Sequence, residues 1–264
     1  FRRVLFRSLD GVIVSHSHGD HFGGLIWIAD KYKADTFWDS GYQFPGSNGA
    51  GEDGWAKILR EKMLRFNPDM TCVSVRRGDK MDWDADLGVT VINPPPGTGT
   101  PVLNNDKRPK NDTPIHHLLN ANAIGIRVTF KDVVFQVTGD IQADYAHAYL
   151  FPFIRETYAE KDRKVDVLVA LSHGIHATRE EAELSRPKIA LGSIYFDGAP
   201  KNWCRQWARE RGGLNRECEA VGAKCFDSGV WGTVTVTSDG KTCYAETEFK
   251  KPRKGVSEYK KTAK

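Results

Sequence analysis

The sequence predicts an α/β protein built from layers of strands and helices. Short apolar runs of strand length alternate with segments of helical periodicity along most of the chain. Strands are expected early and late, with helices between them, and no internal repeat is present. Because each sheet and each amphipathic helix must bury one apolar face against another element, this order favours a layered α/β sandwich.

The first half of the chain is expected to hold four strands and two helices. The strands are expected at residues 11–15, 35–38, 71–75 and 88–92, the last two lying around a polar turn. Helical periodicity covers residues 22–33 and 54–66, and Asn67-Pro68 stops the second helix. Residues 93–114 are rich in Pro, Gly and Asn and are interpreted as a long loop, which in a compact domain is often functional.

The second half alternates in the same way. Lys131-Asp132 separates two strands, at 123–130 and 133–139, as in a hairpin. A helix over 141–158 is expected to kink at Pro152. The remaining elements are strands at 165–171 and 188–196, a helix over 201–212, and a last hairpin formed by 232–237 and 241–249.

Charge is concentrated at the two ends of the chain. The net charge is +4, but residues 1–8 carry +3 and residues 250–264 carry +6, which leaves −5 for residues 9–249. The basic ends therefore do not indicate a nucleic-acid surface on the body. The lysine-rich segment 250–264 is expected to be a disordered tail. No apolar run approaches the roughly 20 residues of a membrane-spanning helix.

The first eight residues, FRRVLFRS, are the in-frame translation of a common sequencing-adapter string. We therefore interpret residues 1–8 as a scar, exclude them from the fold and expect an N-terminally truncated domain at residues 9–249. Five cysteines occur without a C-x-x-C pair, which disfavours a zinc ribbon. Cys225 could pair with Cys243, and Cys204 with Cys218; compartment and oligomeric state stay open.

The segment VIVSHSHGDHFGGL, residues 12–25, carries four metal-ligand side chains within six residues. His16, His18, Asp20 and His21 follow a predicted buried strand, so they lie at one edge of a sheet. Imidazole nitrogens and carboxylate oxygens are the ligands that zinc prefers. Alternation lets His16 and His18 point the same way towards one ion, while Asp20 and His21 turn towards a second. Such a cluster cannot complete both coordination shells, so more ligands must follow.

Two later strand ends supply them. Asp140 follows the strand VVFQV, and His173 follows the strand VDVLVAL. A carboxylate that bridges two ions fits Asp140, and a terminal imidazole fits His173. Among the aromatic side chains, Trp27 is expected in the core, while Trp38, Tyr42 and Phe44 could line a pocket or pack in the core.

With these motifs the chain resembles the metallo-β-lactamase superfamily. The segments NANAIGIRVTFKDVVFQVTGD, VDVLVALSHG and AVGAKCFDSGVWGTVTVTSDG are similar to the hydrolase domain of the ComEC/Rec2-like branch. The resemblance implies an αββα sandwich with a di-metal site between two sheets, whose first strands would precede residue 9.

The chain also departs from the family pattern. Where the superfamily often has another histidine, the sequence has Asn120 and Asn122, and His116 or His117 could replace it. The branch usually has two histidines near the last motif, whereas here a single His173 is followed by His176 three residues later. One ion could therefore be weakly held. Asn122 and His176 are expected to contact the substrate.

The resemblance implies a metal-dependent hydrolase that uses a metal-bound hydroxide. Two zinc ions are expected, with manganese or iron as alternatives; Asp20 and Asp140 are the expected catalytic residues. A phosphodiester, either a small molecule or nucleic acid, is the expected substrate. The alternatives are a lactone or amide hydrolase of the same superfamily, or a degenerate metal-binding domain without turnover.

Overall fold

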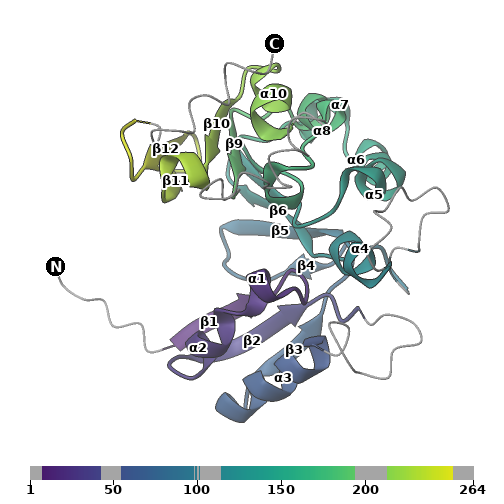
Figure 1. Cartoon of the computed structure of the whole chain (residues 1–264), viewed down its shortest axis with the longest axis vertical. Coiled ribbons are helices and arrows are strands. Elements are labelled where there is room, and N and C mark those ends of the chain that lie inside the picture. The colour runs from purple at the N-terminus through teal and green to yellow at the C-terminus, as the bar shows by residue number, and fades with distance from the viewer. Residues whose placement is uncertain are drawn as a thin grey trace, which may run out of the picture. The chain divides into compact units, whose positions relative to one another are not determined.

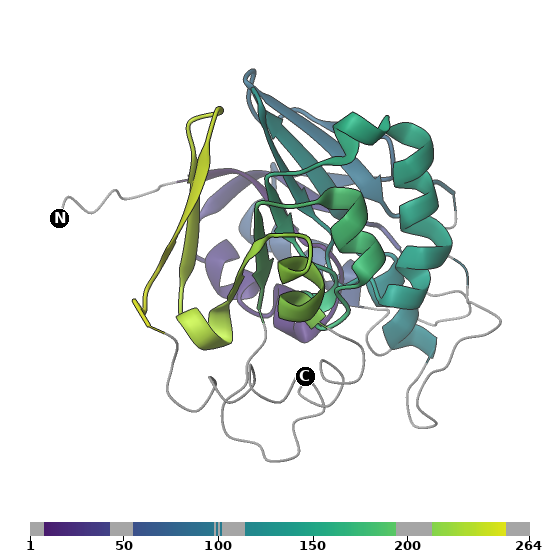
Figure 2. The same cartoon turned by 90° about the horizontal axis from the view of Figure 1, so that it is seen from above.

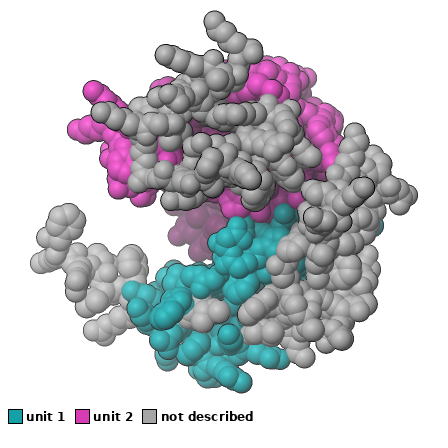
Figure 3. Space-filling model, viewed as in Figure 1, with its two compact units in different colours: residues 1–79, 91–125 teal, residues 80–90, 126–264 magenta. Residues whose placement is uncertain are grey.

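The computed structural model describes residues 8–42, 55–97, 99, 101, 114–193 and 213–251 (Figure 1). The chain divides into two compact units (Figure 3). Unit 1 comprises residues 1–79 and 91–125, and unit 2 comprises residues 80–90 and 126–264. Phe44, Cys204, the helix expected over 201–212 and most of the adapter-like and lysine-rich ends lie outside the described residues.

A parallel three-stranded sheet forms the base of unit 1. Its order is β1 (Ser8–Ile13), β2 (Lys33–Asp39) and β3 (Thr71–Ser74). Val12 lies opposite Phe37, and Phe37 lies opposite Cys72. The first strand begins at Ser8 and ends at Ile13, earlier than the expected 11–15. The motif at residues 16–21 therefore lies just beyond the carboxyl end of β1, with His16 and His18 on the connecting loop and Asp20 and His21 in the helix that follows.

The helix expected over 22–33 is wrong in its extent. Two short helices replace it, α1 (Gly19–Phe22) and α2 (Leu25–Ala29), and β2 already begins at Lys33. The break falls at Gly23-Gly24. A Cβ on Gly23 would lie 2.5 Å from Gly19 O, so only glycine allows this close turn. The helix expected over 54–66 is confirmed as α3 (Trp55–Phe66).

Apolar side chains from these helices cover one face of the three-stranded sheet. Phe22, Leu25, Leu59 and Met63 are buried against Phe37, which is completely inaccessible. Each such side chain stabilises the fold by about 1.5–3 kcal/mol relative to its exposed state. Trp27, expected in the core, is 72 % exposed, because it lies on the side of α2 opposite to the buried Leu25 and Ala29.

A seven-stranded sheet of order β10-β9-β8-β7-β6-β5-β4 belongs mostly to unit 2, and only residues 91–93 of β5 and Gly125 of β6 are assigned to unit 1. The strands are β4 (Lys80–Met81), β5 (Leu87–Asn93), β6 (Gly125–Phe130), β7 (Val133–Val137), β8 (Val167–Val169), β9 (Ile189–Gly192) and β10 (Lys224–Asp227). The expected β6–β7 hairpin is confirmed by its antiparallel register, whereas β7 to β10 are parallel. The strands expected at 71–75 and 88–92 belong to different sheets, because β5 pairs with the intervening strand β4.

Helices cover the parallel part of this sheet (Figure 2). They are α5 (Ala143–Tyr145), the π-helical turn η2 (Ala146–Leu150), α6 (Phe151–Thr157), α7 (Glu160–Arg163), α8 (Arg179–Ser185) and α10 (Gly213–Glu219). The π turn ends just before Pro152, where the sequence predicts an irregularity. Strand β8 packs against α8 and α10 through one buried cluster, to which they contribute Leu168, Ala182 and Leu214 respectively.

Four further elements complete the described chain. Helix α4 (Pro114–Ala121) was not expected, since residues up to 114 are interpreted as loop and the next strand was placed at 123. After α11 (Ser228–Trp231), the last hairpin is confirmed as β11 (Val234–Ser238) and β12 (Cys243–Thr247), in antiparallel register. Strands and helices thus alternate as expected, and the mixed α/β fold class is confirmed.

The described cysteines Cys72, Cys218, Cys225 and Cys243 are free thiols. The pairing of Cys225 with Cys243 considered from sequence is therefore wrong, and the pairing of Cys218 with Cys204 involves a residue outside the described part. Among the described helices, none has the length and apolar character that crossing a bilayer requires.

Candidate metal centre

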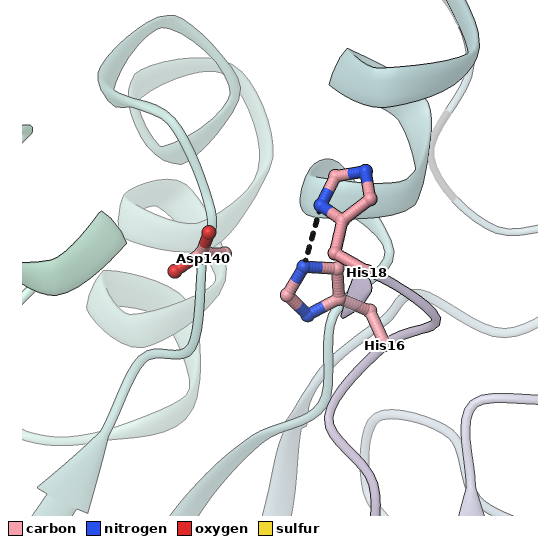
Figure 4. A group of neighbouring side chains, drawn as sticks. All are labelled: His16, His18 and Asp140. Atoms are coloured by element: carbon pink, nitrogen blue, oxygen red, sulfur yellow. Dashed lines mark hydrogen bonds between the residues drawn. The ribbon is translucent and has the colours of Figure 1, made fainter. Parts of the chain in front are cut away.

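Two histidines of the first motif face each other in unit 1. His16 is buried, at 4 % exposure, and His18 is half-buried. His16 Nε2 lies 2.9 Å from His18 Nδ1, as the dashed line in Figure 4 shows. The two rings lie nearly perpendicular, with an interplanar angle of 78°. A ring nitrogen of each histidine thus faces the other, on the loop that follows β1.

This spacing is that of two neighbouring ligands on one metal ion. With metal–nitrogen distances of about 2.1 Å, neighbouring ligands are about 3.0 Å apart in octahedral and about 3.4 Å apart in tetrahedral coordination. The 2.9 Å between His16 Nε2 and His18 Nδ1 is just below the octahedral value and shorter than the tetrahedral one. The residues present therefore fit a divalent metal on this side.

Ser15 contacts the other ring nitrogen of His16 and also reaches the ring of His21. Its hydroxyl lies 3.0 Å from His16 Nδ1 and 3.4 Å from His21 Nδ1. A hydrogen bond at one ring nitrogen fixes the orientation of the ring and directs the other nitrogen towards a metal. His21 Nε2 also lies 3.5 Å from the Asp20 carboxylate, whose side chain is 64 % exposed. Asp20 is therefore the solvent-facing member of the motif.

Unit 2 carries a second pair of candidate ligands. Asp140 is buried on the loop after β7, which Figure 4 also shows, and His173 lies in the 3-10 turn η3 (Ser172–Gly174) after β8. His173 Nε2 lies 3.3 Å from Asp140 Oδ1. Ser193, beyond β9, lies with its hydroxyl 2.8 Å from His173 Nδ1. The arrangement repeats that of unit 1: one ring nitrogen meets a serine, and the other meets a fellow ligand.

The turn that presents His173 has an unusual backbone. Ser172 and His173 have φ angles of 46° and 60°, and Gly174 follows at 88°. Non-glycine residues rarely adopt the left-handed region, and two in succession persist only where the surroundings hold them. A Cβ on Gly174 would lie 3.3 Å from Gly192 Cα, so β9 passes close behind the turn.

The residues expected to contact substrate are buried. Asn122 is fully inaccessible, and its side-chain nitrogen donates to Leu118 O at 2.8 Å, which ties it to α4. His176 is 3 % exposed, and its Nδ1 accepts from Ala143 N at 3.5 Å. Both positions suit a supporting role behind the site, and their contact with substrate stays a prediction.

The region of the missing histidine forms part of α4. His116 and His117, the possible replacements, lie in that helix; the His116 side chain is outside the described part, and His117 is 5 % exposed. Tyr42 is buried and lines a small cavity with His16 and Leu119, and burial raises its pKa above the usual value. Tyr42 therefore offers a neutral hydroxyl beside the first motif.

The six predicted ligands divide between the units. His16, His18, Asp20 and His21 belong to unit 1, and Asp140 and His173 belong to unit 2. All six offer an imidazole nitrogen or a carboxylate oxygen, which zinc, manganese and iron accept. The orienting residues Ser15 and Ser193 were missed from the sequence. Ser15 directly precedes the motif, which is a usable signal, whereas Ser193 is 20 residues from His173 and carries none.

Comparison with known proteins agrees with these features. The family model described as "Metallo-beta-lactamase superfamily" matches residues 3–181. No curated protein matches the chain. Among solved structures, the metallo-beta-lactamase fold protein YhfI from Bacillus subtilis is 14 % identical, with a TM-score of 0.43 over 90 % of this chain and 78 % of that chain.

Two further structures show similarity of the same degree. Igni18, a metallo hydrolase from Ignicoccus hospitalis, is 16 % identical, with a TM-score of 0.41 over 91 % of this chain and 80 % of its own. CmlA, a diiron beta-hydroxylase from Streptomyces venezuelae, is 13 % identical, with a TM-score of 0.49 over 84 % of this chain and 44 % of its own. The family match includes the first motif, Asp140 and His173, and the chain belongs to the metallo-β-lactamase superfamily.

Proposed function

We propose that the chain is a metal-dependent hydrolase whose two ligand sets together hold two divalent ions, zinc in the first instance. One observation carries the proposal. In each unit two donor atoms lie at the separation of neighbouring metal ligands, and a serine hydroxyl contacts the outer ring nitrogen of a histidine. Rings held in this way are directed before any ion binds.

The ligands are assigned by their type and position. His16 and His18 would hold one ion, and Asp20, His21 and His173 would hold the other. Asp140 would serve both, because a carboxylate has two oxygens that can each bind one ion. Manganese and iron accept the same nitrogen and oxygen donors and are the alternatives.

The protein groups around such a centre have separate tasks. Bound divalent ions lower the pKa of a water molecule towards about 7 and polarise the bond to be broken. Asp20, exposed and beside His21, is placed to accept a proton and pass it to solvent. Ser15 and Ser193 keep the rings of His16 and His173 oriented, and buried Asp140 supplies negative charge that offsets the ions.

A phosphodiester is the proposed substrate class. The similarity of three segments to the ComEC/Rec2-like branch supports it, and assignment to that branch is part of the proposal. Residues 9–249 carry a net charge of −5, which disfavours a long polyanion and favours a small phosphodiester over nucleic acid. A lactone or amide remains the alternative substrate, because the same fold supports several hydrolytic reactions.

A metal-binding domain without turnover is the second candidate. The sequence has Asn120 and Asn122 where the superfamily often has a histidine, and the side-chain nitrogen of Asn122 is engaged by α4. An amide is a weaker ligand than an imidazole, so one ion would be held less tightly. This candidate predicts one bound ion and no hydrolysis.

The decisive experiment combines metal content with hydrolysis of bis-p-nitrophenyl phosphate. We expect two ions per chain and chelator-sensitive cleavage. The variant Asp140→Asn removes a carboxylate while keeping the size of the side chain, and we expect it to lose at least one ion and about 100-fold or more in turnover. The matched control Asp132→Asn, in the β6–β7 turn, should behave as the wild type. Full turnover in Asp140→Asn would refute the ligand assignment.

A further inference from the structure

Glu181 is a buried carboxylic acid on helix α8, whose other two acids, Glu180 and Glu183, are half-buried and exposed. Helix α8 runs through the segment TREEAELS, in which Thr178 caps the helix and accepts a hydrogen bond from Glu181 N at 3.1 Å. Glu181 is 1 % exposed, while Glu183, two residues later, is exposed. Burying a carboxyl group is costly unless its oxygens find partners, so the contacts of Glu181 indicate what it holds.

One carboxyl oxygen of Glu181 contacts two strand ends. Glu181 Oε1 lies 3.3 Å from Leu171 N and 3.4 Å from Thr138 Oγ1. Thr138 lies two residues before Asp140, and Leu171 lies two residues before His173. A single side chain therefore connects the two segments that lead into the proposed ligands of unit 2.

Backbone contacts reinforce the same junction. The Thr138 hydroxyl lies 2.9 Å from Val169 O, and Ser172 N donates to Gly139 O at 2.9 Å. These contacts run between the chain after β7 and the chain after β8. They set the separation of the two strand ends, and the observed 3.3 Å between His173 Nε2 and Asp140 Oδ1 depends on that separation.

The left-handed turn needs such an anchor. Ser172 and His173 both have positive φ angles, a conformation that is strained for a non-glycine residue. Leu171, whose N–H faces Glu181, is the last residue before this turn. Without the contact between Leu171 N and Glu181, the start of this turn would be less restrained.

Burial favours the neutral form of the Glu181 carboxyl group. Burial raises its pKa from 4.5 to about 8, and the hydrogen bond from Leu171 N offsets only part of this effect. The Thr138 hydroxyl has one proton for two acceptors, Val169 O and Glu181 Oε1, so a proton on Glu181 allows both contacts to be satisfied. Cys218 on α10 and Arg163 at the end of α7 also face Glu181. Arg163 donates instead to the carbonyl groups of Tyr158 and Arg155.

We propose that Glu181 is a positioning residue for the candidate metal centre: its buried carboxyl group joins the end of β7, which leads to Asp140, to the end of β8, which leads to His173. The proposal rests on the assignment of Asp140 and His173 as metal ligands. Glu181 touches neither of them and acts through Thr138 and Leu171.

The test compares zinc affinity in three variants, measured by competition with a chromophoric chelator at pH 7.0 and pH 8.8. Glu181→Gln keeps the shape and the neutral charge, so we expect an affinity within about threefold of the wild type at pH 7.0. Glu181→Ala removes the link, and we expect zinc binding about 10–100-fold weaker. Glu183→Gln, an exposed position on the same helix, is the matched control and should not differ from the wild type.

The pH comparison distinguishes positioning from general stability. At pH 8.8 the carboxyl group of wild-type Glu181 is ionised, whereas the amide in Glu181→Gln carries no charge at any pH. We therefore expect the wild type to lose affinity relative to Glu181→Gln. Parallel pH profiles of the two proteins would overturn the proposal, and this comparison holds even if Glu181→Ala does not fold. Wild-type affinity in a folded Glu181→Ala would overturn it as well.

A metal-independent measurement separates this proposal from the proposed function. If wild-type protein binds no zinc, the ligand assignment fails, and the link is then tested by hydrogen exchange in the metal-free chain. At pH 7.0 we expect the amides of residues 171–174 to exchange equally fast in Glu181→Gln and in the wild type. At pH 8.8 we expect these amides to exchange faster in the wild type than in Glu181→Gln. Equal protection of this segment at pH 8.8 would overturn the link itself.

Discussion

At the residue scale, two serine hydroxyls hold the outer nitrogens of candidate ligand rings. Ser193 Oγ lies 2.8 Å from His173 Nδ1, and Ser15 Oγ lies 3.0 Å from His16 Nδ1. A metal-ligating imidazole is oriented by the partner of its second nitrogen, and loss of such a partner typically weakens metal binding 10–100-fold. The effect of these serines on the protein is therefore expected in metal affinity rather than in folding.

The variant Ser193→Ala tests this expectation. We expect zinc affinity to fall by about tenfold or more, because His173 loses the contact that fixes its ring. The urea midpoint should change little, since the hydroxyl is at the edge of the fold. Ser238→Ala, which removes a hydroxyl contact to Thr242 O in the last hairpin, is the control. Equal zinc affinity in Ser193→Ala and wild type would show that the serine does not orient the ligand.

Candidate ligands could be predicted from the sequence because of where they stand. Asp140 and His173 follow apolar runs of strand length, and strand ends place side chains at the edge of a sheet. Glu181 could not be found in the same way. It stands in a run with Glu180 and Glu183, and only the packing of α8 against its neighbours decides which of the three faces inwards.

At the element scale, helix α8 ends in a strained residue. Arg186 occupies the C-cap in the left-handed region, with φ 39° and ψ 56°, and its N–H donates to Ala182 O. Glycine is the preferred residue at such a helix end, because it has no Cβ to clash with the following carbonyl. The arginine is exposed, so its replacement removes little packing.

We therefore expect Arg186→Gly to stabilise the protein by about 0.5–1 kcal/mol, measured as the free energy of unfolding in urea. Glu183→Gly, in the middle of the same helix and also exposed, should instead destabilise it by about 1 kcal/mol. The opposite signs distinguish relief of backbone strain from a general effect of glycine. Destabilisation by both variants would mean that the arginine side chain contributes more than its strain costs.

Element boundaries were harder to predict than element types. The periodicity of residues 22–33 is helical throughout, but Gly23-Gly24 turns the chain, and β2 takes its last residue. Helix α4 was missed because Pro114 was assigned to the preceding loop, although proline is favoured in the first turn of a helix. The hydrophobic pattern indicates which segments are buried. The steric properties of single residues, such as glycine and proline, decide where each helix or strand starts.

At the scale of the whole molecule, Glu181 couples folding to pH. Its pKa is raised from 4.5 to about 8 by burial. Below pH 4.5 the group is protonated in both the folded and the unfolded state, so its contribution to stability is fully present. Between about pH 4.5 and 8 the unfolded state loses the proton while the folded state keeps it. Stability is therefore lost as the pH rises through this window.

We expect the free energy of unfolding to fall more steeply with pH in the wild type than in Glu181→Gln. Each unit of pH in this window costs the wild type at most about 1.4 kcal/mol, or about 4 kcal/mol between pH 5 and 8. Glu181→Gln has no such proton and should lack this component. Urea unfolding at pH 5, 6.5 and 8 gives the difference in the free energy of unfolding between the wild type and Glu181→Gln. The contributions of all other titrating groups cancel in this difference. A constant difference across this range would show that Glu181 does not titrate as inferred.

At the left-handed turn of Ser172 and His173, selection for stability and selection for activity are expected to favour different residues. A library of codons at position 173 selected only for a well-folded chain should drift towards glycine or asparagine, which adopt this backbone at little cost. The same library selected for metal-dependent turnover should return histidine. Divergence of the two populations at this one codon would show that the chain accepts a less stable backbone here in exchange for chemistry.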